Sequence, residues 1–297
     1  MEQHRPVFLK RHLDMRVEEL ADAMTVGRRI GRVDPCAEAL PHLLDAFCDV
    51  CSFTVETFLE GRSCFAVLQS DGTFFMDLNN LRAVALGALR ALAFLAQAGV
   101  VHNDVKPDNI LWGDAAARLV NLGCARLDWS EDSGRNWCHA EDGAGHRGTW
   151  SPEMCLRLPI THRSDIWGLA VSLCELHCGR FVWRTTADTT ADVLAQALGL
   201  CGLQDLPTSL LRRSPLDVTK HFTPNPPGHL PLRCAGPGRY KVLRPARCGL
   251  AQVLGEEWRE SGKAELMELL SCAFVADPED RPSATQLLRL RFIVEPP

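Results

Sequence analysis

The sequence lacks an excess of either charge, a long uncharged apolar run and any internal repeat. Its 297 residues carry 32 basic and 37 acidic side chains, a formal net charge of −5. A chain without a basic excess gives no support for nucleic acid as a partner. The longest apolar stretch, 81–101, contains Arg82 and Arg90. Because charges are costly inside a bilayer, we expect a buried helix there and no membrane partner.

Features of a secreted protein are also scarce. The first residues, MEQHRPVFLKRHLD, carry too many charges for a secretory leader. We therefore expect a reducing compartment, the cytoplasm, with the nucleus as a second location. The 13 cysteines are odd in number, and the CxxC of Cys48 and Cys51 has no second pair at zinc spacing. We interpret most of them as packed thiols, with a metal or redox role as the weaker alternative.

Composition and patterning favour a globular chain of one large domain or two lobes. Hydrophobic residues make up 46% and charged residues 23%. The first part is mixed, with a short apolar run at 7–10, a helix at 17–30 and strands at 53–59 and 64–68. Long apolar helices follow at 83–95, 166–176, 265–273 and 284–290. Proline and glycine predict a loop-rich stretch over 207–245.

The segment 101–111, VHNDVKPDNIL, places His102, Asp104, Lys106 and Asn109 between the apolar pairs 100–101 and 110–111. An aspartate such as Asp104 can accept the proton of an attacking hydroxyl, and a lysine two residues on, Lys106, can neutralise a transferred phosphate. An asparagine five residues after the aspartate, Asn109, can hold magnesium. The segment resembles the catalytic loop of protein kinases, H-R-D-x-K-x-x-N. A capped polar loop is the alternative, which the agreement with this motif at His102 and the other three positions disfavours.

Four further segments resemble kinase elements in the family's order. RLVNLG at 118–123 stands where a strand and D-F-G occur, and GTWSPE at 148–153 resembles the end of the activation segment. SDIWG at 164–168 resembles the start of the central helix, and DPEDRPS at 277–283 resembles the closing element. The resemblance extends from residue 6 to 293. By it, the chain is identified as a member of the eukaryotic protein kinase superfamily.

The resemblance implies an α+β, two-lobed fold with a truncated, β-rich small lobe over 1–70 and a helical large lobe over 71–297. An insertion at 203–262 resembles the group of cyclin-dependent, mitogen-activated, CDC-like and homeodomain-interacting kinases. The start, LKRHLDMRVEEL, instead resembles NF-kappa-B-inducing kinase, and we give the insertion more weight.

The resemblance also implies roles for individual residues. Arg281 would pair with Glu153, and Asp165 would hold the catalytic loop. Together with His102, these residues would stabilise the fold. Thr149 would lie where a substrate residue docks. Lys106 is typical of serine/threonine kinases, and the single tyrosine, Tyr240, leaves little room for tyrosine autophosphorylation.

The nucleotide clamp departs from the family pattern. Lys10 is the candidate for the phosphate-holding lysine, because no other lysine precedes Lys106, with Glu19, or Glu18, as its brace. A plain surface lysine is the alternative. Nine residues before Lys10 accommodate one strand, so the glycine-rich loop is missing unless upstream strands precede Met1. The segment 26–33, VGRRIGRV, is an alternative glycine-rich loop that lacks the central glycine.

The metal site departs from the pattern as well. Asn121-Leu122-Gly123 replaces D-F-G, and an asparagine offers magnesium a neutral oxygen where aspartate offers a charged one. Because Asn109 is neutral too, we expect ATP and Mg²⁺ to bind weakly. Asn103 replaces the arginine that pairs with a phosphorylated activation loop, so loop phosphorylation is not the expected switch.

Three hypotheses follow. We predict a pseudokinase that binds or regulates a protein partner, with an active kinase as one candidate partner. The alternative is an active ATP-dependent serine/threonine kinase with Asp104 as its base and a protein as its substrate. The third is an inactive folded fragment.

Overall fold

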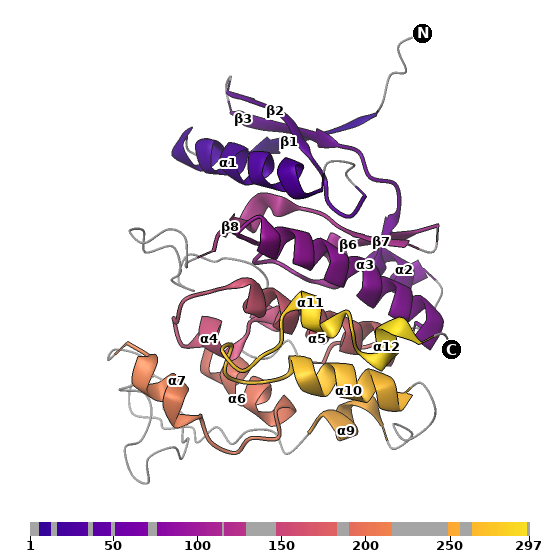
Figure 1. The fold of residues 1–297 in the computed structure, drawn as a ribbon, viewed down its shortest axis with the longest axis vertical. Coiled ribbons are helices and arrows are strands. Elements are labelled where there is room, and N and C mark those ends of the chain that lie inside the picture. The colour runs from indigo at the N-terminus through magenta and orange to yellow at the C-terminus, as the bar shows by residue number, and fades with distance from the viewer. Residues whose placement is uncertain are drawn as a thin grey trace.

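The structure is a computed structural model that describes residues 6–12, 17–34, 38–48, 51–70, 76–114, 116–128, 147–182, 190–215, 249–255 and 263–295. Figure 1 shows a small sheet and one helix at one end of the molecule, a long helix across the middle, and further helices at the other end. This arrangement is an α+β fold in which the described strands gather mainly in the first half of the chain.

The small sheet consists of three antiparallel strands in the order β1-β3-β2. The strands are β1 (Val7–His12), β2 (Leu43–Cys48) and β3 (Ser52–Thr57). In the register, Phe8 lies opposite Glu56 and Lys10 lies opposite Thr54. Directly opposed residues share a face of the sheet, so these four side chains point the same way. That face is turned toward helix α1 (Val17–Val33) and the centre of the molecule.

Helix α1 overturns the alternative glycine-rich loop at 26–33, because all eight residues are helical. Val26 and Ile30 are four residues apart and both buried, which is the spacing of the buried face of a helix rather than of a glycine-rich loop. Gly27 serves close packing here, since a Cβ at this position would lie 2.6 Å from the Cβ of Leu43.

The strand expected at 64–68 is also wrong, because Cys64–Ser70 forms helix α2. The backbone N–H of Ala66 donates to the Ser63 hydroxyl at 3.1 Å, which is the hydrogen bond of a helix N-cap. The strand β4 (Arg62–Ser63) ends just before the helix and pairs with β6. The local cap therefore overrides the apolar, strand-like composition of this segment.

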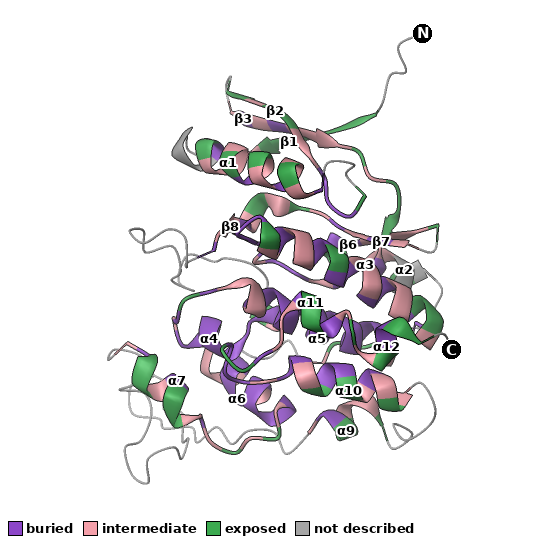
Figure 2. Cartoon of the chain, viewed as in Figure 1, coloured by how far each residue is buried: buried purple, intermediate pink, exposed green. Residues whose placement is uncertain are grey.

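Helix α3 (Leu78–Gln97) is the buried helix expected from the long apolar stretch. The Asp77 carboxylate caps it by accepting from the N–H groups of Asn79 and Asn80 at 2.9 and 3.0 Å. By length and composition α3 could cross a membrane, but eight of its residues are buried against the rest of the fold. Figure 2 shows buried residues along it.

Short elements after α3 carry most of the candidate site. They are β5 (Val100–Val101), η1 (Pro107–Asn109), β6 (Ile110–Gly113), β7 (Ala116–Leu119), η2 (Leu122–Cys124) and β8 (Arg126–Leu127). Because β6 and β7 form a hairpin, the residues before β6 lie close to the residues after β7. The two ends of the segment 104–121 are therefore near each other.

Among the remaining helices, α5 (His162–Cys178) packs against α3, and its residues from Ser164 to Leu176 are all buried. A capping box of Thr161 and Ser164 begins α5, and Gly179 ends it at φ +63°. The others are η4 (Arg147–Thr149), α4 (Pro152–Cys155), α6 (Thr190–Leu200), α7 (Thr208–Arg213), α9 (Leu250–Leu254), α10 (Lys263–Ala273), α11 (Ala284–Leu287) and α12 (Arg291–Val294).

The domain boundaries stay predictions. Of the insertion predicted at 203–262, residues 216–248 and 256–262 lie outside the described residues. The described cysteines are all free thiols, and the described residues contain no cluster of three or more metal-ligating side chains.

We predict opposite effects for the same substitution at two helical glycines. In Gly87→Ala the new Cβ would lie 2.3 Å from the Ala117 carbonyl oxygen, so we expect a loss of about 1–3 kcal/mol from overpacking. In Gly31→Ala nothing lies within 4 Å, so the better helix propensity should add about 0.5–1 kcal/mol. Urea unfolding of both variants beside the parent chain measures the difference. Equal shifts in the two variants would contradict the packing of α3 against β7.

Candidate functional site

A cavity of about 480 Å³ lies between the small sheet and the β6–β7 hairpin. Phe8 and Phe58 line it from the small-sheet side, and Leu111 and Val120 line it from the hairpin side. Both phenylalanines are about half exposed, at 51% and 47%. The cavity is therefore an open apolar cleft built by residues from both parts of the chain.

A continuous chain of hydrogen bonds lies at the inner end of this cleft. Lys10 Nζ donates to Asn121 Oδ1 at 2.8 Å, and Asn121 Nδ2 donates to Asn109 Oδ1 at 3.0 Å. Asn109 Nδ2 donates to Asp104 Oδ2 at 2.8 Å and to the Asp104 carbonyl at 2.7 Å. Lys106 Nζ pairs with the same Asp104 oxygen at 2.9 Å. All five polar residues predicted for base, phosphate and metal roles thus meet in one network.

The loop that carries Asp104 is held by a buried carboxylate. Asp165 Oδ2 accepts from the N–H of His102, and Oδ1 accepts from the N–H of Asn103, each at 2.8 Å. The expected contact of Asp165 with the loop backbone is therefore present. Burial raises the pKa of Asp165 to about 7, although the two N–H donors act in the opposite direction.

His102 fixes the same loop from the other side. Its ring is fully buried, its Nε2 lies 3.0 Å from the Val120 carbonyl, and its Nδ1 accepts from the N–H of Asp104 at 3.3 Å. Burial lowers the pKa of His102 to about 4, so the ring is neutral at pH 7 and donates through Nε2. The histidine thus links the loop to the strand end that leads to Asn121.

Two asparagines of the site occupy the left-handed region of backbone conformation. Asn103 and Asn121 both have φ +67°, a conformation that few residues other than glycine adopt and that asparagine tolerates. The backbone at Asn121 thereby turns its carboxamide toward Asn109. Asparagine at 121, the predicted metal position, is thus compatible with the turn that the backbone makes here.

The residues present do not fit a magnesium ion. Neither Asn109 nor Asn121 carries a charge, and Asn109 Oδ1, the oxygen that a cation would need, already accepts from Asn121. Asp104 Oδ2 is also engaged, by Asn109 and Lys106. Asn121 directs its Nδ2 donor at Asn109, and its Oδ1 already accepts from Lys10.

Two predicted residues remain without a described role. Glu19 lies in α1, but its side chain is outside the described residues, so its contact with Lys10 stays a prediction. Thr149 is 7% exposed and lines a small cavity of about 10 Å³ together with Asn103 and Val105. Its role in substrate docking also stays a prediction. Residues 129–146, which contain Ser130 and Ser133, lie outside the described residues.

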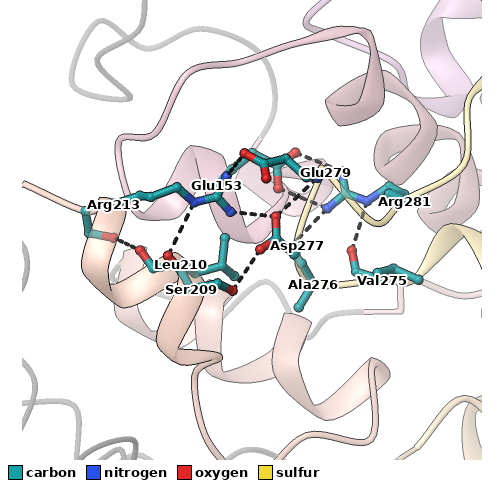
Figure 3. A network of polar contacts seen from close by, with 10 residues as sticks. Glu153, Ser209, Leu210, Arg213, Val275, Ala276, Asp277, Glu279 and Arg281 are labelled. Atoms are coloured by element: carbon teal, nitrogen blue, oxygen red, sulfur yellow. Dashed lines mark hydrogen bonds and ion pairs between the residues drawn. The ribbon is translucent and has the colours of Figure 1, made fainter.

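The predicted pair of Glu153 and Arg281 is present and fully buried. Two hydrogen bonds join the side chains, at 2.7 and 3.0 Å, and both side chains are 0% exposed (Figure 3). Burial alone would raise the pKa of Glu153, but the charge and hydrogen bonds of Arg281 outweigh it and lower the pKa. Removing one partner of such a pair costs about 3–5 kcal/mol.

A second polar group lies beside this pair in Figure 3. Arg213 of α7 bonds Asp277 at 2.5 Å and also Glu279, and the Ser209 hydroxyl donates to Asp277 at 2.8 Å. These contacts tie α7 to the segment that presents Arg281. They lie far from the cleft in the fold and explain packing rather than chemistry.

Sequence reasoning missed Glu56, which lines the cleft next to Lys10. Burial raises the pKa of its carboxyl, while Lys10 and the Thr54 hydroxyl act to lower it. The available signal was an acidic residue at an inward position of the strand SFTVET. That signal requires the strand register, which the sequence alone did not provide.

The chain matches a family model described as protein kinase domain over residues 42–293. It is 23% identical to dual specificity protein kinase lkh1 of Schizosaccharomyces pombe over 255 residues, 82% of this chain and 36% of that protein. It is 27% identical to homeodomain-interacting protein kinase 4 of Mus musculus over 157 residues, 51% of this chain and 25% of that protein. The chain thus matches about a third or less of the length of these relatives.

A solved crystal structure of a kinase domain has the same fold. The similarity has a TM-score of 0.76 at 17% sequence identity and covers 99% of this chain and 89% of the other. At this identity the likeness establishes the fold alone.

We predict that His102 makes stability depend on pH. The ordinary pKa of histidine is near 6.5, and that of folded His102 is about 4. As pH falls from 6.5 to 4 the unfolded chain binds a proton that the folded chain does not, so stability present above 6.5 is lost, by roughly 3 kcal/mol at most. In His102→Gln the free energy of unfolding should therefore decline less over this range. Parallel pH profiles, measured by urea unfolding, would contradict a buried neutral ring.

Proposed function

The chain belongs to the protein kinase superfamily, and on that premise we propose that it is a catalytically impaired member of serine/threonine type. We propose that it acts by binding or regulating a protein partner, with an active kinase as one candidate. One observation carries the proposal: the hydrogen bond from Asn121 Nδ2 to Asn109 Oδ1, at 3.0 Å, lies where the family holds magnesium.

The hydrogen-bond chain supports the proposal because the protein's own side chains join the two sides of the cleft without a nucleotide. Lys10 belongs to the small sheet, and Asn121 follows the β6–β7 hairpin, so their 2.8 Å bond joins the two parts of the chain directly. In a working phosphoryl-transfer site, metal and phosphates would bridge these groups. A protein whose own side chains make the bridge can hold the cleft in one arrangement for a partner.

Charge supports the same proposal. The described charged groups of the network and cleft are Lys10, Lys106, Asp104 and Glu56, which balance one another. A triphosphate without magnesium carries several negative charges and needs a net positive site. We therefore propose that ATP and Mg²⁺ bind weakly, and that the loss of transition-state stabilisation makes transfer slow or absent.

The second candidate function is an active serine/threonine kinase. The geometry that favours it is the buried Asp104, 5% exposed, with Lys106 at 2.9 Å and Lys10 in the same network. In this candidate function we assign Asp104 the role of the base, Lys106 that of the neighbouring lysine, and Lys10 that of the phosphate-holding lysine of the family pattern. The kinase relatives act on proteins according to their names, so in either case a protein is the proposed partner or substrate.

We predict that the chain transfers no phosphate above background. The assay uses labelled ATP with magnesium and a mixed protein substrate, and the matched blank is Asp104→Asn, which keeps the shape of the side chain but removes the base. Incorporation should be equal in the parent chain and in the blank. Incorporation that disappears in Asp104→Asn would establish the second candidate and overturn the proposed impairment.

We also predict that Asn121→Asp restores metal-dependent nucleotide binding. The carboxylate would face Asn109 Oδ1 without a donor between them, so a divalent cation becomes the favoured bridge. At ligand concentrations ten times Kd the variant should gain about 1.4 kcal/mol, or roughly 2–4 °C in Tm, from ATP with magnesium but not with EDTA.

The matched control for this prediction is Asn79→Asp on the exposed first turn of α3, which adds the same charge away from the cleft. Its Tm should not respond to magnesium and ATP. A response equal to that of Asn121→Asp, or no response in either variant, would contradict our account of the metal position.

A further inference from the structure

Two charged side chains, Lys10 and Glu56, lie among the described residues that line the 480 Å³ cleft. The same two residues also line a second cavity of about 120 Å³ behind them, between the small sheet and α1. They therefore stand together at the inner end of a cleft whose other described lining residues are apolar except for Thr57 and Asn121. A ligand that fills the cleft must contact them.

The two charges differ in how far they are already engaged. Lys10 Nζ is directed at Asn121 Oδ1 at 2.8 Å, and a Cβ on Gly123 would lie only 2.7 Å from it, so it is held close to the β7–η2 turn. Burial raises the pKa of Glu56, and the charge of Lys10 and the Thr54 hydroxyl act to lower it. A carboxylate can accept about four hydrogen bonds, so Glu56 keeps acceptor capacity toward the cleft.

We propose that the cleft selects a flat aromatic ligand with a cationic or strongly donating nitrogen group, which Glu56 binds, over anionic ligands such as polyphosphates. The inference deepens the proposed function and rests on it, because metal and triphosphate bound firmly in the cleft would occupy the space that this ligand needs.

The walls of the cleft support the aromatic part of this ligand. Phe8 and Phe58 expose about half of their surface at its mouth, and Leu111 and Val120 form the opposite wall. Stacking on exposed aromatic rings favours planar aromatic partners. Glu56 lies directly opposite Phe8 in the sheet and lines the same cleft, so an acceptor stands beside this aromatic wall.

The cationic part follows from charge complementarity. An amidinium or amine gains a charge-assisted hydrogen bond from Glu56. A phosphate would be attracted by Lys10, but it would also have to desolvate and approach the neighbouring carboxylate of Glu56. Lys10 Nζ is engaged by Asn121 Oδ1, whereas Glu56 feels the charge of Lys10 but forms no ion pair within the part of the chain that the structure describes. Glu56 therefore keeps acceptor capacity for a ligand that donates hydrogen bonds.

The test compares three probes that share one ring: 2-naphthamidine, 2-naphthamide and 2-naphthoate, which are cationic, neutral and anionic. Binding to the full chain is measured by calorimetry in EDTA without nucleotide. We expect the amidine to bind at least tenfold more tightly than the amide, and the naphthoate to bind most weakly. In Glu56→Gln the preference for the amidine over the amide should fall to near one.

Glu268→Gln on the exposed face of α10 removes the same charge elsewhere and should leave the preference unchanged. Thermal unfolding checks that Glu56→Gln folds. If it does not, Lys10→Met decides, because loss of the neighbouring cation should strengthen the preference for the amidine. Equal binding of the three probes, no binding of any, or a preference that survives Glu56→Gln would overturn the inference. Each of these results leaves the phosphotransfer comparison untouched, so the two proposals fail separately.

Discussion

The arrangement of the cleft depends on one amide–amide hydrogen bond. Asn121 donates to Asn109, and this bond is formed only because a carboxamide carries a donor and an acceptor on the same group. Two carboxylates, or an aspartate facing the Asn109 oxygen, would need a cation between them. With the bond in place, Asn109 can turn its own N–H groups to Asp104, and Asn121 can offer its oxygen to Lys10. The side chains of Lys10, Asn121, Asn109 and Asp104 are therefore oriented by one another.

The buried contacts beneath the cleft do not depend on the hydrogen bond between Asn121 and Asn109. Asp165 holds the loop through two backbone N–H groups, and Glu153 and Arg281 form a pair that is closed to solvent. Breaking such a pair costs about 3–5 kcal/mol, because a charge is left buried without a partner. The hydrogen bond between Asn121 and Asn109, at the inner end of the cleft, joins two uncharged groups and contributes only about 0.5–1.5 kcal/mol. The fold can thus tolerate a new residue at 121 far more easily than at 153 or 281.

The sequence could predict contacts between neighbouring residues and contacts that the family resemblance implied, but not other contacts between distant parts of the chain. Asp104, Lys106 and Asn109 lie within six residues, so any compact loop brings them together, and the resemblance supplied Glu153 with Arg281. The bond between Lys10 and Asn121 joins residues 111 positions apart, and the place of Glu56 depends on the register of β1 and β3. Neither is visible in a local pattern. The errors at 64–68 and in the alternative reading of 26–33 arose where a serine cap and helical packing decided between structures of similar composition.

The proposed impairment and the proposed ligand preference have a common electrostatic origin. Lys106 is paired with Asp104 at 2.9 Å, and Lys10 shares the inner end of the cleft with Glu56. Each cation that could hold a phosphate therefore has an anion beside it, and no described carboxylate is placed at either metal position to recruit further positive charge. In the low-dielectric cleft such local pairing decides which ligand charge is stabilised. In the proposed function, the absence of a carboxylate at position 121 weakens triphosphate binding and the carboxylate at position 56 also opposes it, so the two features act in the same direction.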